Sequence, residues 1–263
     1  MKRLALLLIV AACADKKPAT PPAPPAALPT QPPVQAAAFA IPATTKLLIT
    51  GVVDDWAATN VTLRVWRRDG ATWTAQGDAW PAVVGRTGVA WGIGLHGEGA
   101  PGREGPLKKE GDGKSPAGAF AIRQAFGVAG EPPKGTTWPY ESTKGGDYQC
   151  VDDPASDHYA TIVDRKQVAS DWQSHEEMLR PDQLYTWVVD IAHNPDHVRG
   201  KGSCIFFHVW GGKDTTTVGC TAMEEPRLTK LITQLDPADN PIYVLLPRAD
   251  YSALAPAWGL PPL

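Results

Sequence analysis

The sequence has no excess of positive charge and no long apolar run in its main part. Lysine and arginine together number 25, against 28 aspartate and glutamate residues, which gives a formal net charge of −3. Such a chain has no basic stripe that could neutralise phosphates, so nucleic acid is not an expected partner. Beyond the N-terminal region, no segment is long and apolar enough to span a bilayer.

Proline and glycine, in contrast, are frequent, with 26 and 25 residues, and tryptophan occurs 10 times. This composition argues against a helical bundle and favours β structure rich in turns. A chain of 263 residues can bury one good core or two small ones, so a folded domain is expected.

The first 13 residues have the pattern of an export signal. Lys2 and Arg3 are basic, and residues 4–11 form an apolar run that is too short for a membrane span. The small residues before Cys13 resemble a bacterial lipobox, in which the cysteine becomes the lipidated first residue of the mature protein. We therefore expect a membrane anchor at Cys13. The alternative is an ordinary cleaved signal peptide with an incidental cysteine.

Residues 14–45 are rich in proline and alanine and contain almost nothing to bury. Such a segment cannot offset its own ordering entropy, so a disordered tether is predicted. A lipidated cysteine followed by this spacer would hold a folded domain away from a membrane surface. The expected location is the cell envelope, as a lipoprotein that faces the periplasm.

Residues 46–263 are predicted to form one mainly-β domain with a few peripheral helices. Apolar and polar side chains alternate over 61–66, and Asp69-Gly70 separates this run from 71–74, as in a β-hairpin. Further strands are expected at 46–53, 119–123, 184–192, 204–210 and 242–246.

Two helices are predicted in this domain. Ser174 and Glu177 form a capping-box pattern before Met178, which indicates a helix start. A second helix begins behind Pro226 and ends at Asp236-Pro237. Its apolar positions recur at helical spacing: Leu228, Leu231, Ile232 and Leu235.

Cys220 has the surroundings that best suit a nucleophile. The four cysteines, at 13, 150, 204 and 220, leave an odd three once Cys13 is lipidated, so at least one is a free thiol or has a special role. Cys220 lies in the glycine-containing loop 217–222, directly ahead of the second predicted helix. Backbone N–H groups and the helix dipole there would favour a thiolate and could hold an oxyanion.

A thiolate nucleophile also needs a base, and His208 lies on the predicted strand 204–210. Alternation places Cys204, Phe206, His208 and Trp210 on one face of that strand. The short loop 211–217 could then fold the chain back and bring imidazole and thiol together. The alternative is a core histidine beside a buried cysteine.

Four segments of the chain resemble the L,D-transpeptidase catalytic-domain (YkuD-like) family. They are KEGDGKSPAGAF at 109–120, CVDDP at 150–154, GSCIFFH at 202–208 and TVGC at 217–220. The usual signature of the family is a histidine, a loop, and then Ser/Thr-His-Gly-Cys-aliphatic-Asn. This chain has Val218 in place of the second histidine, Ala222 in place of the asparagine, and a shorter loop.

The resemblance implies a mostly-β enzyme that acts on peptidoglycan stem peptides without a metal or cofactor. Cys220 would attack the carbonyl between the third residue of a tetrapeptide and its terminal D-alanine. His208 would hold the thiolate and later protonate the leaving amine, while the N–H groups of Gly219 and Cys220 stabilise the oxyanion. An acceptor amine then gives a cross-link, and water in its place gives L,D-carboxypeptidase activity.

Other residues around this pair have less certain roles. In the family a backbone carbonyl often orients the imidazole, and Asp214 is a local alternative. Trp210, Thr217 and Asp153 are candidate substrate contacts, although Asp153 could instead only shape its loop.

Three further alternatives follow from the sequence. A non-catalytic envelope module, binding peptidoglycan or a protein partner, would explain the missing histidine and asparagine. Cys150 and Cys204 could form a disulfide in an oxidising compartment, but nothing in the sequence reports their separation. His193 and His197 are four residues apart, yet Pro195 prevents the helix that a zinc site of this spacing needs, so no metal is expected.

Overall fold

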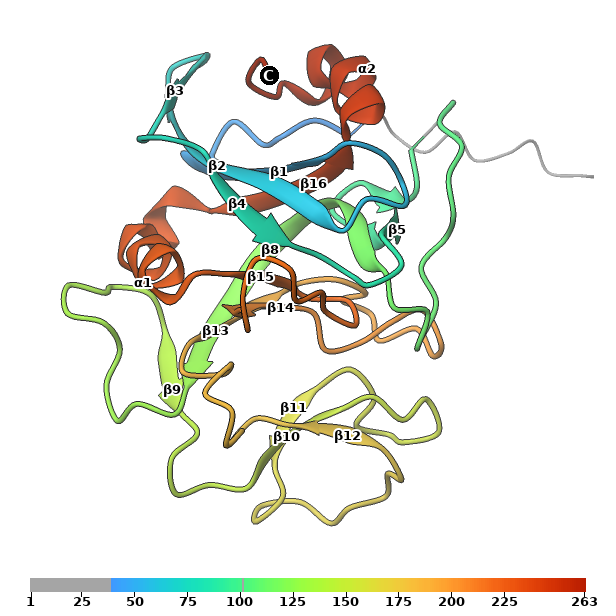
Figure 1. Ribbon diagram of the computed structural model, residues 1–263, viewed down its shortest axis with the longest axis vertical. Coiled ribbons are helices and arrows are strands. Elements are labelled where there is room, and N and C mark those ends of the chain that lie inside the picture. The colour runs from blue at the N-terminus through green and yellow to red at the C-terminus, as the bar shows by residue number, and fades with distance from the viewer. Residues whose placement is uncertain (1–38, 101) are drawn as a thin grey trace, which may run out of the picture. The chain divides into compact units, whose positions relative to one another are not determined.

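The computed structural model describes residues 39–100 and 102–263, whose arrangement is shown in Figure 1. The predicted signal segment with Cys13, and the predicted tether up to residue 38, lie outside the described residues. The described part is mainly β with few helices, as predicted.

The elements follow one another along the chain with these bounds. The strands are β1 (Leu47–Val53), β2 (Asn60–Asp69), β3 (Thr72–Ala75), β4 (Trp80–Val83), β5 (Val89–Trp91), β6 (Ile93–Gly94), β7 (Gly97–Glu98), β8 (Ser115–Gly127), β9 (Tyr140–Ser142), β10 (Tyr148–Val151), β11 (Ile162–Asp164), β12 (His175–Glu177), β13 (Val188–Ile191), β14 (Phe206–Val209), β15 (Thr221–Met223) and β16 (Ile242–Pro247). The helices are α1 (Glu225–Gln234), the 3-10 helix η1 (Pro237–Asp239) and α2 (Arg248–Trp258).

The central sheet closes on itself. Its strand order is β1-β16-β8-β13-β14-β15-β4-β2, and the ring closes because β1 pairs with both β16 and β2. Most neighbours are antiparallel, but β1 with β16 and β14 with β15 are parallel. The side chains that fill the main core include Leu47, Leu63, Phe120, Phe207 and Met223, all fully buried. The closed sheet therefore supplies a rigid frame for the loops at its rim.

The predicted strands and the predicted hairpin are present in this sheet. The hairpin is formed by β2 and β3, and Gly70 at its turn has a φ of +57°, a conformation that favours glycine. Strand β8 is much longer than predicted, while β13 and β14 are shorter than the predicted 184–192 and 204–210. The differences lie at strand ends, where hydrogen-bond pairing rather than local sequence sets the boundary.

The two α-helices contact the outside of this sheet. The predicted helix behind Pro226 is confirmed as α1, which buries Leu228, Leu231 and Ile232. Helix α2 contacts β1 and β16 and was not predicted, because Pro256 interrupts its sequence pattern. Within the described residues, neither helix has the length and apolarity needed to cross a membrane.

A small separate sheet, in the order β11-β10-β12, is built from the segment between β9 and β13 (Figure 1). The helix predicted from Ser174 and Glu177 is wrong, because His175–Glu177 forms β12 and pairs antiparallel with β10. No apolar helical periodicity follows the capping-box pattern, so pairing with β10 decides the local structure.

A disulfide joins the small sheet to the central sheet. Cys150 of β10 is bonded to Cys204, which lies just before β14, and 54 residues separate them in sequence. Cys150 belongs to a second apolar cluster that also contains Met178, Tyr185 and Cys220, and Cys204 packs against this cluster. The disulfide that the sequence left open is therefore present, and it fixes the small sheet against the strand that carries His208.

We expect the double variant Cys150→Ala/Cys204→Ala to have a lower free energy of unfolding, by about 2–4 kcal/mol, because a cross-link of this span restricts the unfolded chain. Urea denaturation of the oxidised parent and the variant measures the difference. The parent protein under a reducing agent is the control and should match the variant. Equal denaturation midpoints for the oxidised parent and the variant would contradict a stabilising role.

Candidate functional site

Two parallel strands bring His208 and Cys220 to the same cavity. In the register of β14 with β15, Phe207 lies opposite Thr221, and residues 210–220 form the loop that returns the chain. His208 is part of β14, and Cys220 directly precedes β15. Both side chains line a cavity of about 230 Å³. The structure thus places together the imidazole and the thiol that the sequence pattern singled out.

His208 is buried and oriented by its own backbone. Its Nδ1 lies 2.7 Å from the carbonyl oxygen of Val209. A carbonyl only accepts hydrogen bonds, so Nδ1 carries the ring proton and Nε2 is the free acceptor of the neutral ring. Burial lowers the pKa of His208 to about 4, although the bond to Val209 opposes this shift. Asp214, the alternative orienting group, lies on the exposed loop and makes no described hydrogen bond to His208.

Cys220 is a buried free thiol, and its sulfur is 3.4 Å from the carbonyl oxygen of Cys204, to which it donates. Burial raises the pKa of the Cys220 thiol, and the negative charge of Glu176 adds to this effect. The expectation of a thiolate stabilised by a helix N-terminus is wrong, because β15 lies between Cys220 and α1. At neutral pH the resting thiol and imidazole are therefore both uncharged.

The loop ahead of Cys220 is held by hydroxyl groups. Ser115 and Thr217 each donate to the carbonyl oxygen of Cys220, at 2.9 Å and 2.7 Å. The N–H of Gly219 donates to the Thr217 hydroxyl at 3.2 Å. A Cβ at position 219 would lie 3.1 Å from Ile205 Cδ1, so a larger residue there requires the Ile205 side chain to shift. The backbone of this loop is thus fixed, and the N–H of Gly219 is occupied by the Thr217 hydroxyl.

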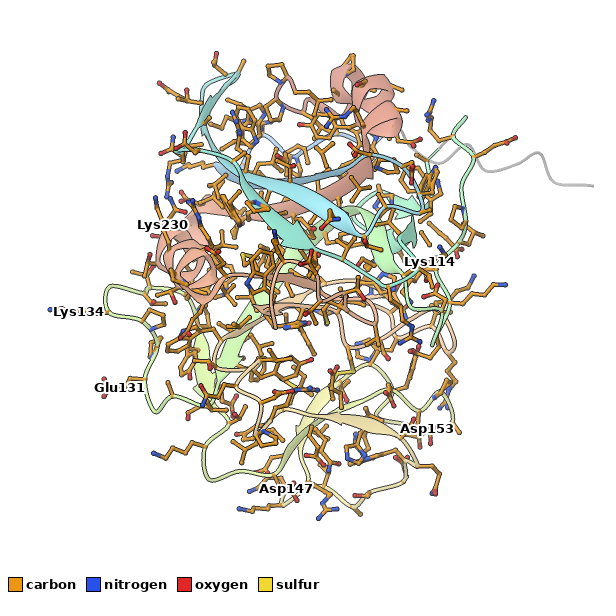
Figure 2. All side chains as sticks on the ribbon, in the orientation of Figure 1. Lys114, Glu131, Lys134, Asp147, Asp153 and Lys230 are labelled. Carbon is orange, nitrogen blue, oxygen red and sulfur yellow. A yellow bond between two sulfur atoms is a disulfide. The ribbon has the colours of Figure 1, made fainter. Side chains whose placement is uncertain are left out.

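The three predicted substrate contacts have different positions. Trp210 and Thr217 line the cavity with Cys220, but the Thr217 hydroxyl is bound within the loop. Asp153 lies in the loop after β10, at the edge of the molecule in Figure 2. Its carboxylate accepts from the N–H groups of Ala155 and Gln173, which lowers its pKa. The observed contacts of Asp153 are those of a residue that shapes its loop.

The cavity also contains polar residues that sequence analysis missed: Glu176, Arg180 and Tyr185. They come from β12 and from the segment that leads into β13. The Tyr185 hydroxyl donates to the carboxylate of Glu176. No spacing in the sequence relates these three residues to Cys220. They reach the cavity because the small sheet and the segment after it pack beside the central sheet.

A second cavity, of about 210 Å³, adjoins the first on the side of Gly219. Glu176, Arg86 and Val218 line both cavities. The second is lined by charged groups of both signs, including the buried Lys108, which pairs with Asp112 at 2.6 Å. The two cavities together form a cleft on both sides of the loop that carries Cys220.

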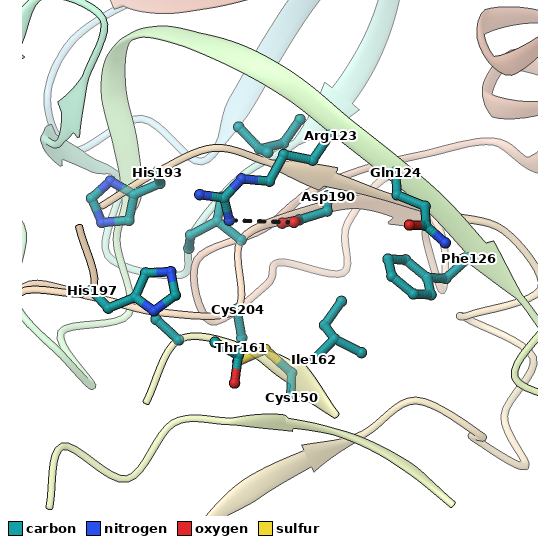
Figure 3. A pocket seen from close by; sticks show the side chains of 13 residues that line it. Arg123, Gln124, Phe126, Cys150, Thr161, Ile162, Asp190, His193, His197 and Cys204 are labelled. Atoms are coloured by element: carbon teal, nitrogen blue, oxygen red, sulfur yellow. Dashed lines mark ion pairs between the residues drawn. A yellow bond between two sulfur atoms is a disulfide. The ribbon is translucent and has the colours of Figure 1, made fainter. Parts of the chain in front are cut away.

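A separate cavity, of about 380 Å³, lies beside the disulfide, and Figure 3 shows its lining. Arg123 and Asp190 form an ion pair in its wall at 3.5 Å. His193 and His197 also line it, but Nε2 of His193 is bonded to the carbonyl of Lys201. In residues 39–100 and 102–263, no group of three histidine, cysteine or carboxylate side chains is arranged to hold a metal ion.

The buried carboxyl group of Asp190 in this wall predicts a pH effect on stability. Burial raises the pKa of Asp190 to about 6, although Arg123 acts in the opposite direction. A carboxyl whose pKa is higher in the folded state stabilises the fold fully below its unfolded pKa, and this contribution is lost as the pH rises through its folded pKa.

Relative to Asp190→Asn, we expect the unfolding free energy of the parent to fall by about 2–3 kcal/mol between pH values of about 4 and about 7. Urea denaturation across this range measures the difference. Asp214→Asn, on an exposed loop, is the matched control. The difference in unfolding free energy between the parent and this variant should stay constant over the same pH range. A difference between parent and Asp190→Asn that stays constant with pH would contradict the argument.

Comparison with known proteins identifies the family. The chain matches the model of the L,D-transpeptidase catalytic domain, YkuD, over residues 52–244. No curated protein and no solved structure matches it. Members of this family are L,D-transpeptidases, acyltransferases that act on peptidoglycan peptides. Since the match covers most of the chain and nearly all of the closed sheet, the chain belongs to the L,D-transpeptidase catalytic-domain (YkuD) family.

Proposed function

We propose that this protein is a cysteine-dependent L,D-transpeptidase that works through a thioester on Cys220. The observation that carries the proposal is the meeting of Cys220 and His208 in one cavity of a chain from this family. The free thiol adds support, because the other two cysteines of the described residues are joined to each other.

The proposed reaction has two transfers. The Cys220 sulfur bonds to the carbonyl carbon of the third residue of a stem tetrapeptide, the C–N bond to D-alanine breaks, and D-alanine leaves as the amine after gaining a proton. An acceptor amine then attacks the thioester, loses a proton and releases the sulfur. The N–H groups of Gly219 and Cys220 are proposed to bind the oxyanion, for which the Gly219 N–H must first leave the Thr217 hydroxyl. The free Nε2 of His208 is proposed to exchange protons with the reacting groups.

The shape and charge of the cleft support a peptide substrate. Its two cavities meet at Glu176, Arg86 and Val218, which gives room on both sides of the loop that carries Cys220. Charged groups of both signs suit stem peptides, which carry carboxylates as well as amines. Water in place of the acceptor amine would give L,D-carboxypeptidase activity at the same site.

One observation favours a second candidate, a non-catalytic module that binds peptidoglycan or a protein partner. The thiol is buried and its raised pKa keeps it uncharged at rest. Val218 and Ala222 occupy the positions of the usual histidine and asparagine. A module of this kind would keep the cleft but would form no covalent intermediate.

The location in the cell envelope is also a proposal. The basic residues, the apolar run and the lipobox-like end at Cys13 support export and a lipid anchor. The proline- and alanine-rich segment that follows would then act as a spacer between the membrane and the folded domain.

The test is intact-protein mass spectrometry after incubation with purified disaccharide-tetrapeptide, with analysis of the muropeptides from the same tubes. We expect the parent to carry a transient adduct equal to the substrate minus D-alanine, and to produce dimers or tripeptides. Cys220→Ala should form no adduct. His208→Ala should lose on the order of 100-fold or more in rate, as for removal of an acid–base group.

His197→Ala is the matched control, since His197 lines the separate cavity and should be dispensable. Product formation by Cys220→Ala at the parent rate would refute the thioester route. A folded parent that forms no adduct and leaves the muropeptides unchanged, with several acceptor amines supplied, would instead support the binding module.

A further inference from the structure

Two of the cations that line the cleft already have protein partners. Lys108 is buried, forms an ion pair with Asp112 at 2.6 Å, and donates to the carbonyl oxygen of Lys109 at 2.7 Å. The guanidinium of Arg180 donates to both carboxylate oxygens of Asp182, at 3.1 Å and 3.2 Å. Either cation would have to give up a carboxylate of the protein before it could bind an anionic ligand fully.

Arg86 differs from both of these cations. It lines the first cavity together with Cys220 and the second together with Gly219. Its side chain is exposed, and among residues 39–100 and 102–263 its guanidinium has no hydrogen-bond or ion-pair partner. A guanidinium offers five N–H donors in a planar fork, which matches the two oxygens of a carboxylate. Arg86 can therefore bind a carboxylate of a ligand without losing a contact.

The backbone of Arg86 is fixed against the loop that carries Cys220. Its N–H donates to the carbonyl oxygen of Thr217 at 2.8 Å. The preceding residue, Gly85, donates to the Ser115 hydroxyl at 2.9 Å, and that hydroxyl donates to the carbonyl oxygen of Cys220. A Cβ at position 85 would lie 2.3 Å from a backbone carbonyl oxygen, so this close approach requires glycine. The Arg86 side chain thus extends from backbone that is held beside the nucleophile.

The other charged groups of the second cavity, apart from Lys108, are carboxylates. Glu110 accepts from two neighbouring hydroxyl groups, at 2.5 Å and 2.7 Å. Asp152 has one carboxylate oxygen that is buried without a hydrogen-bond partner, and Glu176 lines both cavities. These negative charges repel an anionic group of a ligand. Such a group is therefore favoured at Arg86 rather than elsewhere in the cleft.

The proposed substrate presents one anion close to the bond that breaks. Cys220 attacks the carbonyl group that precedes D-alanine, and D-alanine bears its free carboxylate on the carbon next to its nitrogen. That carboxylate therefore lies within a few atoms of the sulfur during acylation. In a peptide that continues beyond this residue, an uncharged amide takes the place of the carboxylate. A guanidinium binds the carboxylate more strongly, because the hydrogen bonds are assisted by charge on both sides.

We propose that Arg86 is a specificity-determining residue that binds the free carboxylate of the residue released in the reaction. This contact selects stem peptides that end at that residue over longer chains, and it places the bond that breaks beside Cys220. The inference rests on the proposed function for the identity of the substrate. The contact itself forms on binding and requires no turnover.

The test measures binding in the absence of turnover. The full chain carrying Cys220→Ala is titrated calorimetrically with disaccharide-tetrapeptide, and separately with the same compound ending in D-alaninamide. We expect the free acid to bind on the order of 10- to 100-fold more tightly than the amide. Addition of Arg86→Gln should bring the two affinities within a few-fold of each other. Arg86→Lys should keep part of the preference, because it retains the charge but not the planar fork.

Arg227→Gln is the matched control. Arg227 belongs to α1, lies 5.8 Å from the centre of the Trp80 ring, and lines neither cavity. This variant should keep the full preference for the acid. The amide also controls for folding, since a misfolded Arg86 variant would lose affinity for both compounds, whereas loss of the proposed contact weakens binding of the acid alone.

Three results would overturn the proposal. They are equal affinities for acid and amide or no binding of either, an unchanged preference in Arg86→Gln, and loss of the preference in Arg180→Gln but not in Arg86→Gln. None of them depends on a thioester. A parent protein that forms the adduct without preferring the free acid would refute this inference alone. A Cys220→Ala protein that prefers the acid, while the parent forms no adduct, would refute the thioester route alone.

Discussion

The parallel pairing of β14 with β15 is the constraint on which the rest of the site depends. Parallel neighbours need a connection that returns the chain, and here residues 210–220 make it within the rim of a closed sheet. This geometry places Cys220 at the start of one strand and His208 within the other. Two hydroxyls then bind the carbonyl of Cys220 and fix the loop. Strand pairing and the hydrogen bonds of the loop therefore set the positions of Cys220 and His208 before any substrate binds.

Burial has a chemical consequence at this site. A thiol and an imidazole enclosed by the closed sheet and the small sheet lose the solvation that charged forms need, so the neutral pair is favoured at rest. In the proposed reaction, the thiolate must then form when substrate is present. The small sheet adds to this burial, because the disulfide holds β12, with Glu176, against the central sheet. One covalent link thus both stabilises the fold and holds the surroundings of Cys220 in place.

The sequence predicted those features that depend on local pattern. Alternation and the Asp69-Gly70 turn identified the β2–β3 hairpin, and Pro226 with its apolar spacing identified α1. Cys220 and His208 were singled out by their surroundings in the sequence together with the family resemblance. The residues around Glu176 were wrongly predicted as a helix. A capping-box pattern occurs there, but no helical periodicity follows it. The hydrogen bond between Glu176 and Tyr185 and the disulfide between Cys150 and Cys204 depend on how distant segments pack. No pattern in a single sequence reports this packing.

The charge state of His208 tests the central claim, that the resting pair is neutral, most directly. Nuclear magnetic resonance of protein labelled with ¹⁵N in histidine, with His208→Ala to assign the signals, would report both ring nitrogens as the pH is lowered. The account predicts a neutral ring with the proton on Nδ1 at neutral pH, and a pKa of about 4. An imidazolium at neutral pH that becomes neutral in Cys220→Ala would contradict it, because that result would show a resting ion pair with a thiolate.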